Sequence, residues 1–115
     1  MNQLRMNEIE NSSDSIALAF DPEYTIQKVN LTSNGTTLTI NPCTGYTAVN
    51  GQIPTFELWL SANTAKTSIS ISNTIQVVNS DNMPDQISTD KIFVFVWRFV
   101  GNKQTLNYGY SFTKN

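Results

Sequence analysis

KIFVFVWRFV, residues 91–100, is the stretch that decides the fold of this chain. Only its first residue and Arg98 are not apolar. Its aromatic face consists of Phe93, Phe95, Trp97 and Phe99. Its aliphatic face consists of Ile92, Val94, Val96 and Val100. A strand with one face in water alternates apolar and polar residues, so we expect this strand to be covered on both faces.

The two faces of this strand need different covers. The four aromatic side chains, at about 150–250 Å² each, belong in the core between two sheets. The aliphatic face needs a second cover, because a small two-sheet domain buries only the inner face of each sheet. That cover is either the apolar strand expected at residues 16–20 or a neighbouring copy of the chain. We therefore predict an oligomer interface at Ile92, Val94, Val96 and Val100.

The composition describes a small domain with an uncharged polar surface. The chain has 115 residues, a net charge of −2 and only 14% charged residues, so its polarity comes mainly from Asn, Thr, Ser and Gln. It lacks a basic stripe for nucleic acid, and its pI of about 4.8 disfavours an anionic membrane surface. No apolar run reaches the roughly 20 residues that span a bilayer, and the first residues lack a signal-peptide core. We expect one domain, no nucleic-acid or membrane partner, and no export.

Residue types that carry chemistry are sparse. The sequence has no histidine, the commonest general base and metal ligand, and its single cysteine, Cys43, excludes an intrachain disulfide. Cys43 stands in a turn sequence, Asn-Pro-Cys-Thr-Gly, and we interpret it as a structural thiol. The acidic residues are scattered, and no motif places two of them about 5–10 Å apart, as glycoside hydrolysis requires. We expect no enzyme activity, no metal and no cofactor.

From residue 16 onward the chain has the pattern of short strands separated by turn signals. Strands are expected at residues 16–20, 24–31, 36–41, 55–60, 92–100 and 104–112. Asn34-Gly35 predicts a hairpin with Leu31 opposite Leu38 and Val29 opposite Ile40. The pattern predicts an all-β fold, a small antiparallel β-sandwich of jelly-roll-like form.

Two further turns decide strand pairing. Residues 68–78 form either one bent strand or a hairpin at Asn73-Thr74. The last hairpin turns at Gly101-Asn102, and we favour a two-residue turn there because it sorts the apolar faces better than a three-residue turn. That register sets Trp97 opposite Leu106, Phe95 opposite Tyr108, and Phe93 opposite Tyr110.

Residues 1–15 differ from the rest of the chain. They mix Asn, Glu, Ser and Asp with Leu4, Met6 and Ile9 at a spacing that fits neither a helix nor a strand. They are either a frayed terminus or an arm that orders on a partner. We divide the chain into a short extended N-terminal arm, residues 1–15, and a β-sandwich domain, residues 16–115. Leu4, Met6 and Ile9 are the residues expected to contact the partner.

Trp59 and Tyr46 suggest an alternative function as a carbohydrate-binding β-sandwich module. Trp59 is expected on an outward strand face beside Glu57, and Tyr46 lies in a glycine-containing loop. Both rings could stack on a sugar. The competing interpretation gives them packing roles, and the sequence leaves both readings open.

The order of elements from Thr37 onward resembles the small β-sandwich modules of tailed-phage fibre and capsid-decoration proteins, including the head fibres of crAss-like phages. The resemblance rests on TLTINP at residues 37–42, FELWLSAN at 56–63, TSISI at 67–71, KIFVFV at 91–96 and YGY at 108–110. Such modules often carry a Trp-Pro or Trp-x-Gly-Gly stretch, where this chain has Asn79-Ser-Asp-Asn-Met.

The resemblance implies a structural, non-enzymatic virion protein, assembled in the host cytoplasm. It implies a homo-oligomer, with a homotrimer favoured over a homodimer. It also implies attachment to a capsid protein or another virion structural protein through the N-terminal end of the chain.

Overall fold

The structure is a computed structural model that describes residues 6–13, 15–17, 25–43 and 54–114, with residues 6, 7 and 15–17 described by their backbone. The described residues form nine strands and one 3-10 turn, which confirms the all-β prediction. The elements are β1 (Met6–Asn11), β2 (Ser15–Ala17), β3 (Ile26–Leu31), β4 (Thr37–Asn41), β5 (Thr55–Ala62), β6 (Ser68–Ile71), β7 (Ile75–Val77), η1 (Ser80–Asn82), β8 (Lys91–Val100) and β9 (Lys103–Thr113).

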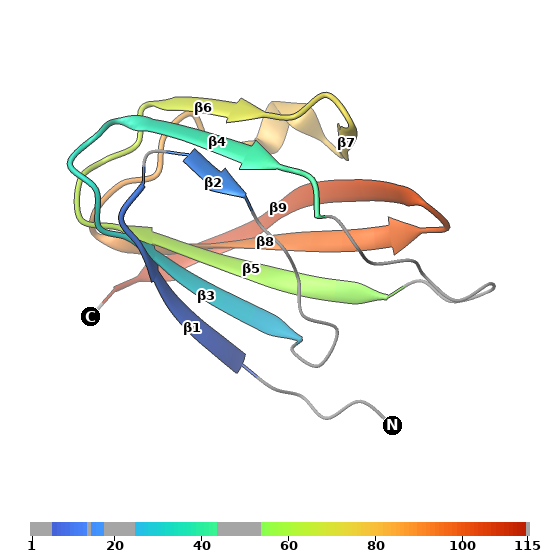
Figure 1. The fold of residues 1–115 in the computed structure, drawn as a ribbon, viewed down its shortest axis with the longest axis horizontal. Helices are drawn as coiled ribbons and strands as arrows, with labels where there is room; N and C mark the ends of the chain where they lie inside the picture. Colours follow the sequence, from blue (N-terminus) through green and yellow to red (C-terminus); the bar gives the residue numbers. More distant parts are fainter. Residues whose placement is uncertain (1–5, 14, 18–24, 44–53, 115) are drawn as a thin grey trace.

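The strands form two sheets that enclose one core (Figure 1). The larger sheet has the order β1-β3-β5-β8-β9-β7, and the smaller has the order β2-β4-β6. Among the described strands, five pairings are parallel and two, β5–β8 and β8–β9, are antiparallel. The antiparallel pairing predicted for the sandwich is therefore wrong for most of the described strands.

The parallel pairings follow from the path of the chain. From β1 to β7 each strand lies in the other sheet from the strand before it. Because each of these connections crosses between the sheets, strands two apart in sequence run in the same direction, and from β1 to β6 they pair in parallel. This alternation replaces the hairpins that the turn signals predict.

The hairpin predicted at Asn34-Gly35 is one of these crossings, and its prediction is wrong. β3 and β4 belong to different sheets. Positive φ among the described residues occurs at Asn79 and Gly101, so Asn34-Gly35 does not adopt a type I′ turn. The four residues expected to pair across the hairpin are all buried, but they enter the one core from opposite sheets. Those residues are Val29, Leu31, Leu38 and Ile40.

Residues 68–78 divide in the same way, and neither alternative considered for them is correct. β6 belongs to the small sheet, while β7 pairs in parallel with β9 at the edge of the large sheet. The turn between them at residues 72–74 again joins the two sheets.

The β8–β9 hairpin has the predicted two-residue turn, with Gly101 at φ 65° and Val100 paired with Lys103. The predicted pairs Trp97–Leu106 and Phe95–Tyr108 are confirmed. The predicted pair Phe93–Tyr110 is wrong, because a β-bulge intervenes and Phe93 lies opposite Ser111. The bulge contains Gly109, the residue of β9 that has no partner in β8.

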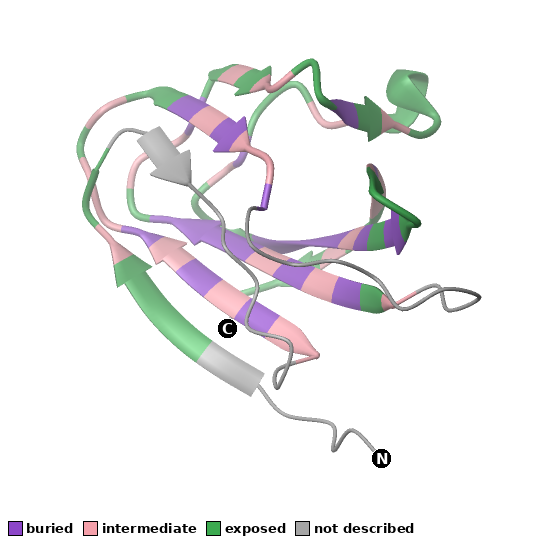
Figure 2. Cartoon of the chain, turned by 45° about the vertical axis from the view of Figure 1, so that its right-hand side comes forward, coloured by how far each residue is buried: buried purple, intermediate pink, exposed green. Residues whose placement is uncertain are grey.

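The core confirms the prediction for the aromatic face of residues 91–100. Its four aromatic side chains are buried between the sheets, and the alternation of buried and less buried residues is visible along β3, β4 and β5 (Figure 2). Trp97 is 0% exposed, and its Nε1 donates to Gln104 Oε1 at 3.0 Å. Gln104 also bonds the backbone of Cys43, with Nε2 donating to Cys43 O at 2.7 Å.

Part of the predicted N-terminal arm lies in the large sheet. β1 pairs in parallel with β3 along all of its residues and forms one edge of that sheet. β2 follows and pairs with β4 in the other sheet. Residues 6–11 are therefore an edge strand, while residues 1–5, including Leu4, lie outside the described residues.

Candidate functional site

The outer face of the large sheet, which points away from the small sheet, carries three aromatic residues of the described segments that the core does not use. We call Trp59, Tyr110 and Phe112 the aromatic cluster. The Trp59 and Phe112 rings meet edge to face with centroids 5.6 Å apart, and Tyr110 lies 6.2 Å from Phe112. Tyr110 is 54% exposed and Phe112 is 37% exposed. The cluster is thus a connected set of rings on an accessible strand face.

Trp59 is fixed within this cluster by its own strand. Its indole Nε1 donates to Glu57 Oε1 at 2.8 Å. Residues two apart in a strand share a face, so this bond holds the indole along the surface of β5. The bond also satisfies the polar end of a ring whose body is half-buried.

The aliphatic face of β8 lies in the same region. Val94 pairs with Trp59 on one side and Tyr110 on the other, and Ile92 pairs with Phe112. Paired residues lie on the same face and their side chains touch, so the aromatic cluster covers the aliphatic face from within the chain. Val94 is accordingly only 1% exposed, and Ile92 is also buried.

The remaining predicted interface residues are more accessible. Val96 is half-buried, and Val100, at the end of the hairpin, is 49% exposed. The strand expected at residues 16–20 is not the cover in its described part, since β2 belongs to the small sheet. Accessible apolar surface on this face therefore comes mainly from Tyr110, Phe112 and Val100.

A polar groove lies beside the aromatic cluster. It has a volume of about 390 Å³ and is lined by Glu8, Ile9, Glu10, Lys28, Asn30, Ser61, Ile92 and Lys114. Lys28 pairs with Trp59 across β3 and β5, which places the groove next to the indole. Ser61 Oγ donates to Asn30 Oδ1 at 2.9 Å within it. The groove combines both charges with hydroxyl and amide groups.

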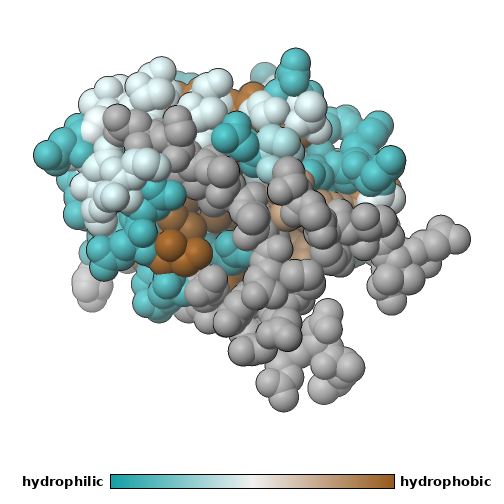
Figure 3. Space-filling view, in the orientation of Figure 1, coloured by the Kyte–Doolittle hydropathy of each residue, from teal (hydrophilic) through white to brown (hydrophobic). Residues whose placement is uncertain are grey.

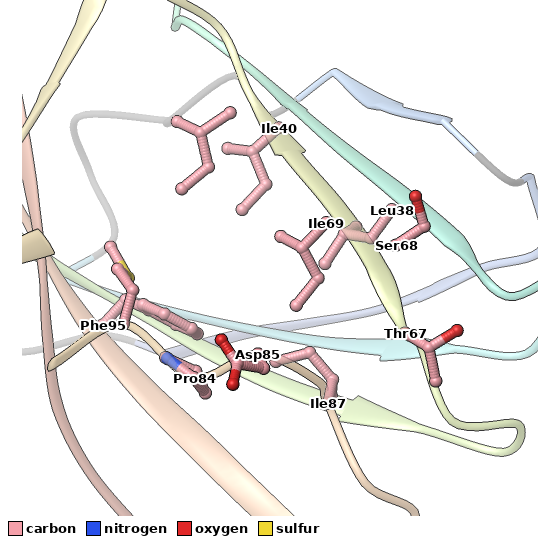
Figure 4. Close-up of a pocket in the computed structure, with 11 residues that line it drawn as sticks. Leu38, Ile40, Thr67, Ser68, Ile69, Pro84, Asp85, Ile87 and Phe95 are labelled. Carbon is pink, nitrogen blue, oxygen red and sulfur yellow. The ribbon is translucent and has the colours of Figure 1, made fainter. Parts of the chain in front are cut away.

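A second cavity, the β6 cleft, opens between the small sheet and the loop that precedes β8. Its volume is about 440 Å³. Ile40 and Ile69 lie on one side of it, and Pro84, Asp85 and Ile87 lie on the other (Figure 4). Most of its lining residues are of apolar type, and Thr67, Ser68 and Asp85 are the polar members.

The outward face of the small sheet differs from both of these regions. Thr37, Ser68 and Ser70 are exposed there. The surface over β4 and β6 is accordingly hydrophilic to near neutral in hydropathy (Figure 3). In the described side chains of β4 and β6, this face offers small hydroxyl groups.

The other predicted site residues fall in different places. Tyr46 and Leu4 lie outside the described residues, and Met6 is described by its backbone in β1. Ile9 is 42% exposed and lines the polar groove. The sequence analysis missed Tyr110 and Phe112 as surface residues, although Gly109 within a strand pattern is a signal for a bulge.

Titratable groups supply little chemistry. In the described parts of the chain, no group of three or more His, Cys, Asp or Glu side chains is arranged to hold a metal ion. The Ser88 hydroxyl donates to the Asp90 carboxylate at 2.8 Å and lowers the pKa of that exposed carboxyl below its ordinary value. The described segments also contain no helix long and apolar enough to cross a membrane.

Comparison with known proteins gives no assignment. No protein-family model, no curated protein and no solved structure matches the chain.

Proposed function

We propose that this chain is a non-enzymatic structural subunit that assembles with copies of itself, as in the tailed-phage fibre and capsid-decoration proteins it resembles. The observation that carries the proposal is the accessible apolar surface of the aromatic cluster. Tyr110 and Phe112 are exposed on this sheet face, together with Val100. Removing these apolar side chains from water lowers the free energy, so a partner that covers them is bound favourably.

The composition of the face supports contact with another protein. Aromatic residues are enriched in the buried centres of protein interfaces, and polar residues surround such centres. Here Glu57, Lys28 and Asn107 lie beside the cluster on neighbouring strand positions. In the proposed assembly the second copy covers the exposed rings, while Ile92 and Val94 lie beneath them. The proposed symmetry is a trimer, with a dimer as the second choice.

The proposal includes the virion as location and a capsid or other virion structural protein as docking partner. Leu4, Met6 and Ile9 remain the proposed contacts. Because residues 6–11 form β1, deleting residues 1–15 would remove this edge strand from the large sheet and the first residue of β2 from the small sheet. Ile9→Lys is a better test, since Ile9 is exposed at the sheet edge. It should prevent incorporation into particles and leave the subunit folded.

Light scattering of the full chain behind a sizing column tests self-assembly. We expect a mass that is a multiple of 12.9 kDa and that persists on dilution. The double variant Tyr110→Lys, Phe112→Lys should give the monomer mass with an unchanged circular dichroism spectrum. Ser70→Lys, on the exposed hydroxyl face of the small sheet, is the matched control and should keep the wild-type mass. A wild-type monomer at high concentration would refute the proposal.

Carbohydrate binding is a second candidate, favoured by the position of Trp59 beside the polar groove. Sugar sites combine an aromatic ring that stacks on the pyranose with polar groups that bond its hydroxyls. Trp59 supplies the ring, while Lys28, Asn30 and Ser61 supply polar groups on the adjacent strands.

Tryptophan fluorescence tests this second candidate directly. Trp97 is fully buried, so a change in emission on adding an oligosaccharide would report on Trp59. Titration with glucose-, galactose- and N-acetylglucosamine-based oligosaccharides should give a saturable change that Trp59→Ala removes. A flat response to all three classes would reject the carbohydrate-binding reading.

A further inference from the structure

The edge of the small sheet at β6 has backbone groups available for another strand. The amides of Ser68 and Ser72 donate to Thr36 O and Ile40 O, at 3.2 and 2.9 Å, on the β4 side. Successive residues of a strand in a parallel ladder direct their backbone groups to opposite sides. The N–H and C=O groups of Ile69 and Ile71 therefore point away from β4. Among the described strands, none pairs with that side of β6.

The β6 cleft lies directly below this edge. Ile69 and Ile71 contribute side chains to the cleft and backbone groups to the edge. Phe95 and Leu38, both buried, belong to its lining, and Met83 and Pro84 form the opposite wall. At one end, Lys66 and Ile87 form an antiparallel bridge with both backbone bonds at 2.9 Å. The cleft is therefore bounded by β6, by the loop and by this bridge.

The size and the charge of the cleft suit a peptide in which an apolar side chain stands next to a basic residue. Its volume of about 440 Å³ falls in the range of roughly 300–1,000 Å³ that is typical of ligand sites. Among the described residues that line it, Asp85 is the one charged side chain, and it is exposed. An apolar group in the cleft with a cation beside Asp85 satisfies both features.

We propose that β6 and the cleft bind an extended peptide segment of a partner protein as a fourth strand of the small sheet. The segment pairs with the backbone of Ile69 and Ile71, inserts an apolar side chain into the cleft and places a lysine or arginine near Asp85. Strand addition of this kind takes affinity from main-chain bonds and specificity from pockets for alternate side chains. The inference goes beyond self-assembly, because it uses the small sheet and not the outer face of the large sheet.

The probe is the synthetic peptide acetyl-Lys-Thr-Leu-Thr-Val-Thr-amide, titrated into isotopically labelled full-length protein and followed by NMR. We expect saturable shifts at the Ile69 and Ile71 amides and at the Leu38 and Ile87 methyl groups. The matched control peptide has the same side chains but N-methyl groups at alternate peptide bonds, so it cannot complete the ladder. It should bind at least about tenfold more weakly.

Variants of the protein test the two parts of the site separately. Ile69→Lys places a charge in the cleft wall and should abolish the shifts. Ser70→Lys, on the opposite face of the same strand, should preserve them. Asp85→Asn should remove the preference for the lysine-containing peptide over one with glutamine in its place. If Ile69→Lys does not fold, the N-methylated peptide makes the same distinction with the wild-type protein.

Four results would overturn the proposal. They are the absence of shifts at millimolar peptide, equal binding of the N-methylated peptide, shifts confined to the β1 edge, and an Asp85→Asn variant with unchanged preference. A fifth result would reassign the site to a second copy of this chain. In that case the Ile69 and Ile71 amides of the peptide-free protein would be protected from hydrogen exchange, and its mass would be a multiple of the monomer mass.

Discussion

Val94 lies opposite Tyr110 in the β8–β9 ladder, one residue away from the pairing that a regular hairpin would give. The extra residue is Gly109, and the side chains of β9 change faces there. Tyr108 packs in the core against Phe93 and Phe95, at ring distances of 6.2 and 5.5 Å. Tyr110, two residues later, lies on the outer face. The bulge thus determines that the protein presents an aromatic surface.

Gly109 is the residue that permits this bulge, and Gly109→Val should destabilise the fold. A Cβ at this position would lie 3.2 Å from the Val94 carbonyl oxygen, which is backbone and cannot easily move away. We expect a loss of about 1–3 kcal/mol in the free energy of unfolding, measured by urea denaturation. Asn107→Val, two residues earlier and half-buried, is the control and should be close to neutral. Equal midpoints for the two variants would show that the close approach has no energetic effect.

What the sequence predicts correctly is local. The aromatic face of residues 91–100 is in the core, and the turn at Gly101-Asn102 has two residues. Both depend on period-two alternation or on short-range turn chemistry, which a single sequence displays directly. Trp59 on an outward face beside Glu57 follows from the same alternation, and the indole bond to Glu57 agrees with it.

The sequence fails to predict which strands pair with one another. The alternation of Val29 and Leu31, like that of Leu38 and Ile40, shows which side faces the core but not which sheet holds the strand. A hairpin and a crossing between sheets bury the same four side chains. The cover of the aliphatic face was expected from residues 16–20 or from a second copy, and the aromatic cluster was missed for a related reason. The bulge at Gly109, which brings Tyr110 and Phe112 beside Val94 and Ile92, interrupts the alternation from which faces are read.

Lys66 is a buried cation that joins the two sheets, and Lys66→Met should destabilise the protein. Its side chain is 1% exposed, and its Nζ donates to Ser33 O at 3.0 Å and also to Gly35 O. These carbonyls lie in the crossing from β3 to β4, so the ammonium group holds that crossing in place. The substitution removes both charge-assisted bonds and should cost roughly 1–3 kcal/mol.

Urea denaturation with an unchanged m value would assign this loss to the native state. Lys28→Met is the matched control, because Lys28 is a half-buried lysine on the outer face of the large sheet. If the two methionine variants lose the same stability, Lys66 has no special role in the crossing.

Asp90 should make a small pH-dependent contribution to stability. Its hydrogen bond from Ser88 lowers the pKa of the folded-state carboxyl, so the contribution is present above the unfolded pKa and disappears as the pH falls through the folded pKa. Asp90→Asn should therefore lower the urea midpoint at neutral pH. The difference from wild type should begin to shrink as the pH falls below the ordinary aspartate pKa of about 3.9, and it should vanish only below the lower pKa of the folded-state carboxyl. Asp81→Asn, in the exposed η1 turn, is the control, and a wild-type difference that grows on acidification would contradict the assignment.

Val94 and Val100 belong to the same predicted interface, but their lysine variants should differ in stability because only Val94 is buried. Val94 is 1% exposed beneath Trp59 and Tyr110, so Val94→Lys must bury an ammonium group or displace the aromatic cluster. We expect Val94→Lys to lower the free energy of unfolding by about 3 kcal/mol or more, so the subunit itself is destabilised whether or not it assembles. Val100 is 49% exposed at the hairpin end, so Val100→Lys should change stability by no more than about 0.5 kcal/mol. Thermal unfolding separates these effects from association, which light scattering reports. If Val94→Lys is as stable as wild type and only its mass changes, then the aliphatic face is covered by a second copy and not by the aromatic cluster.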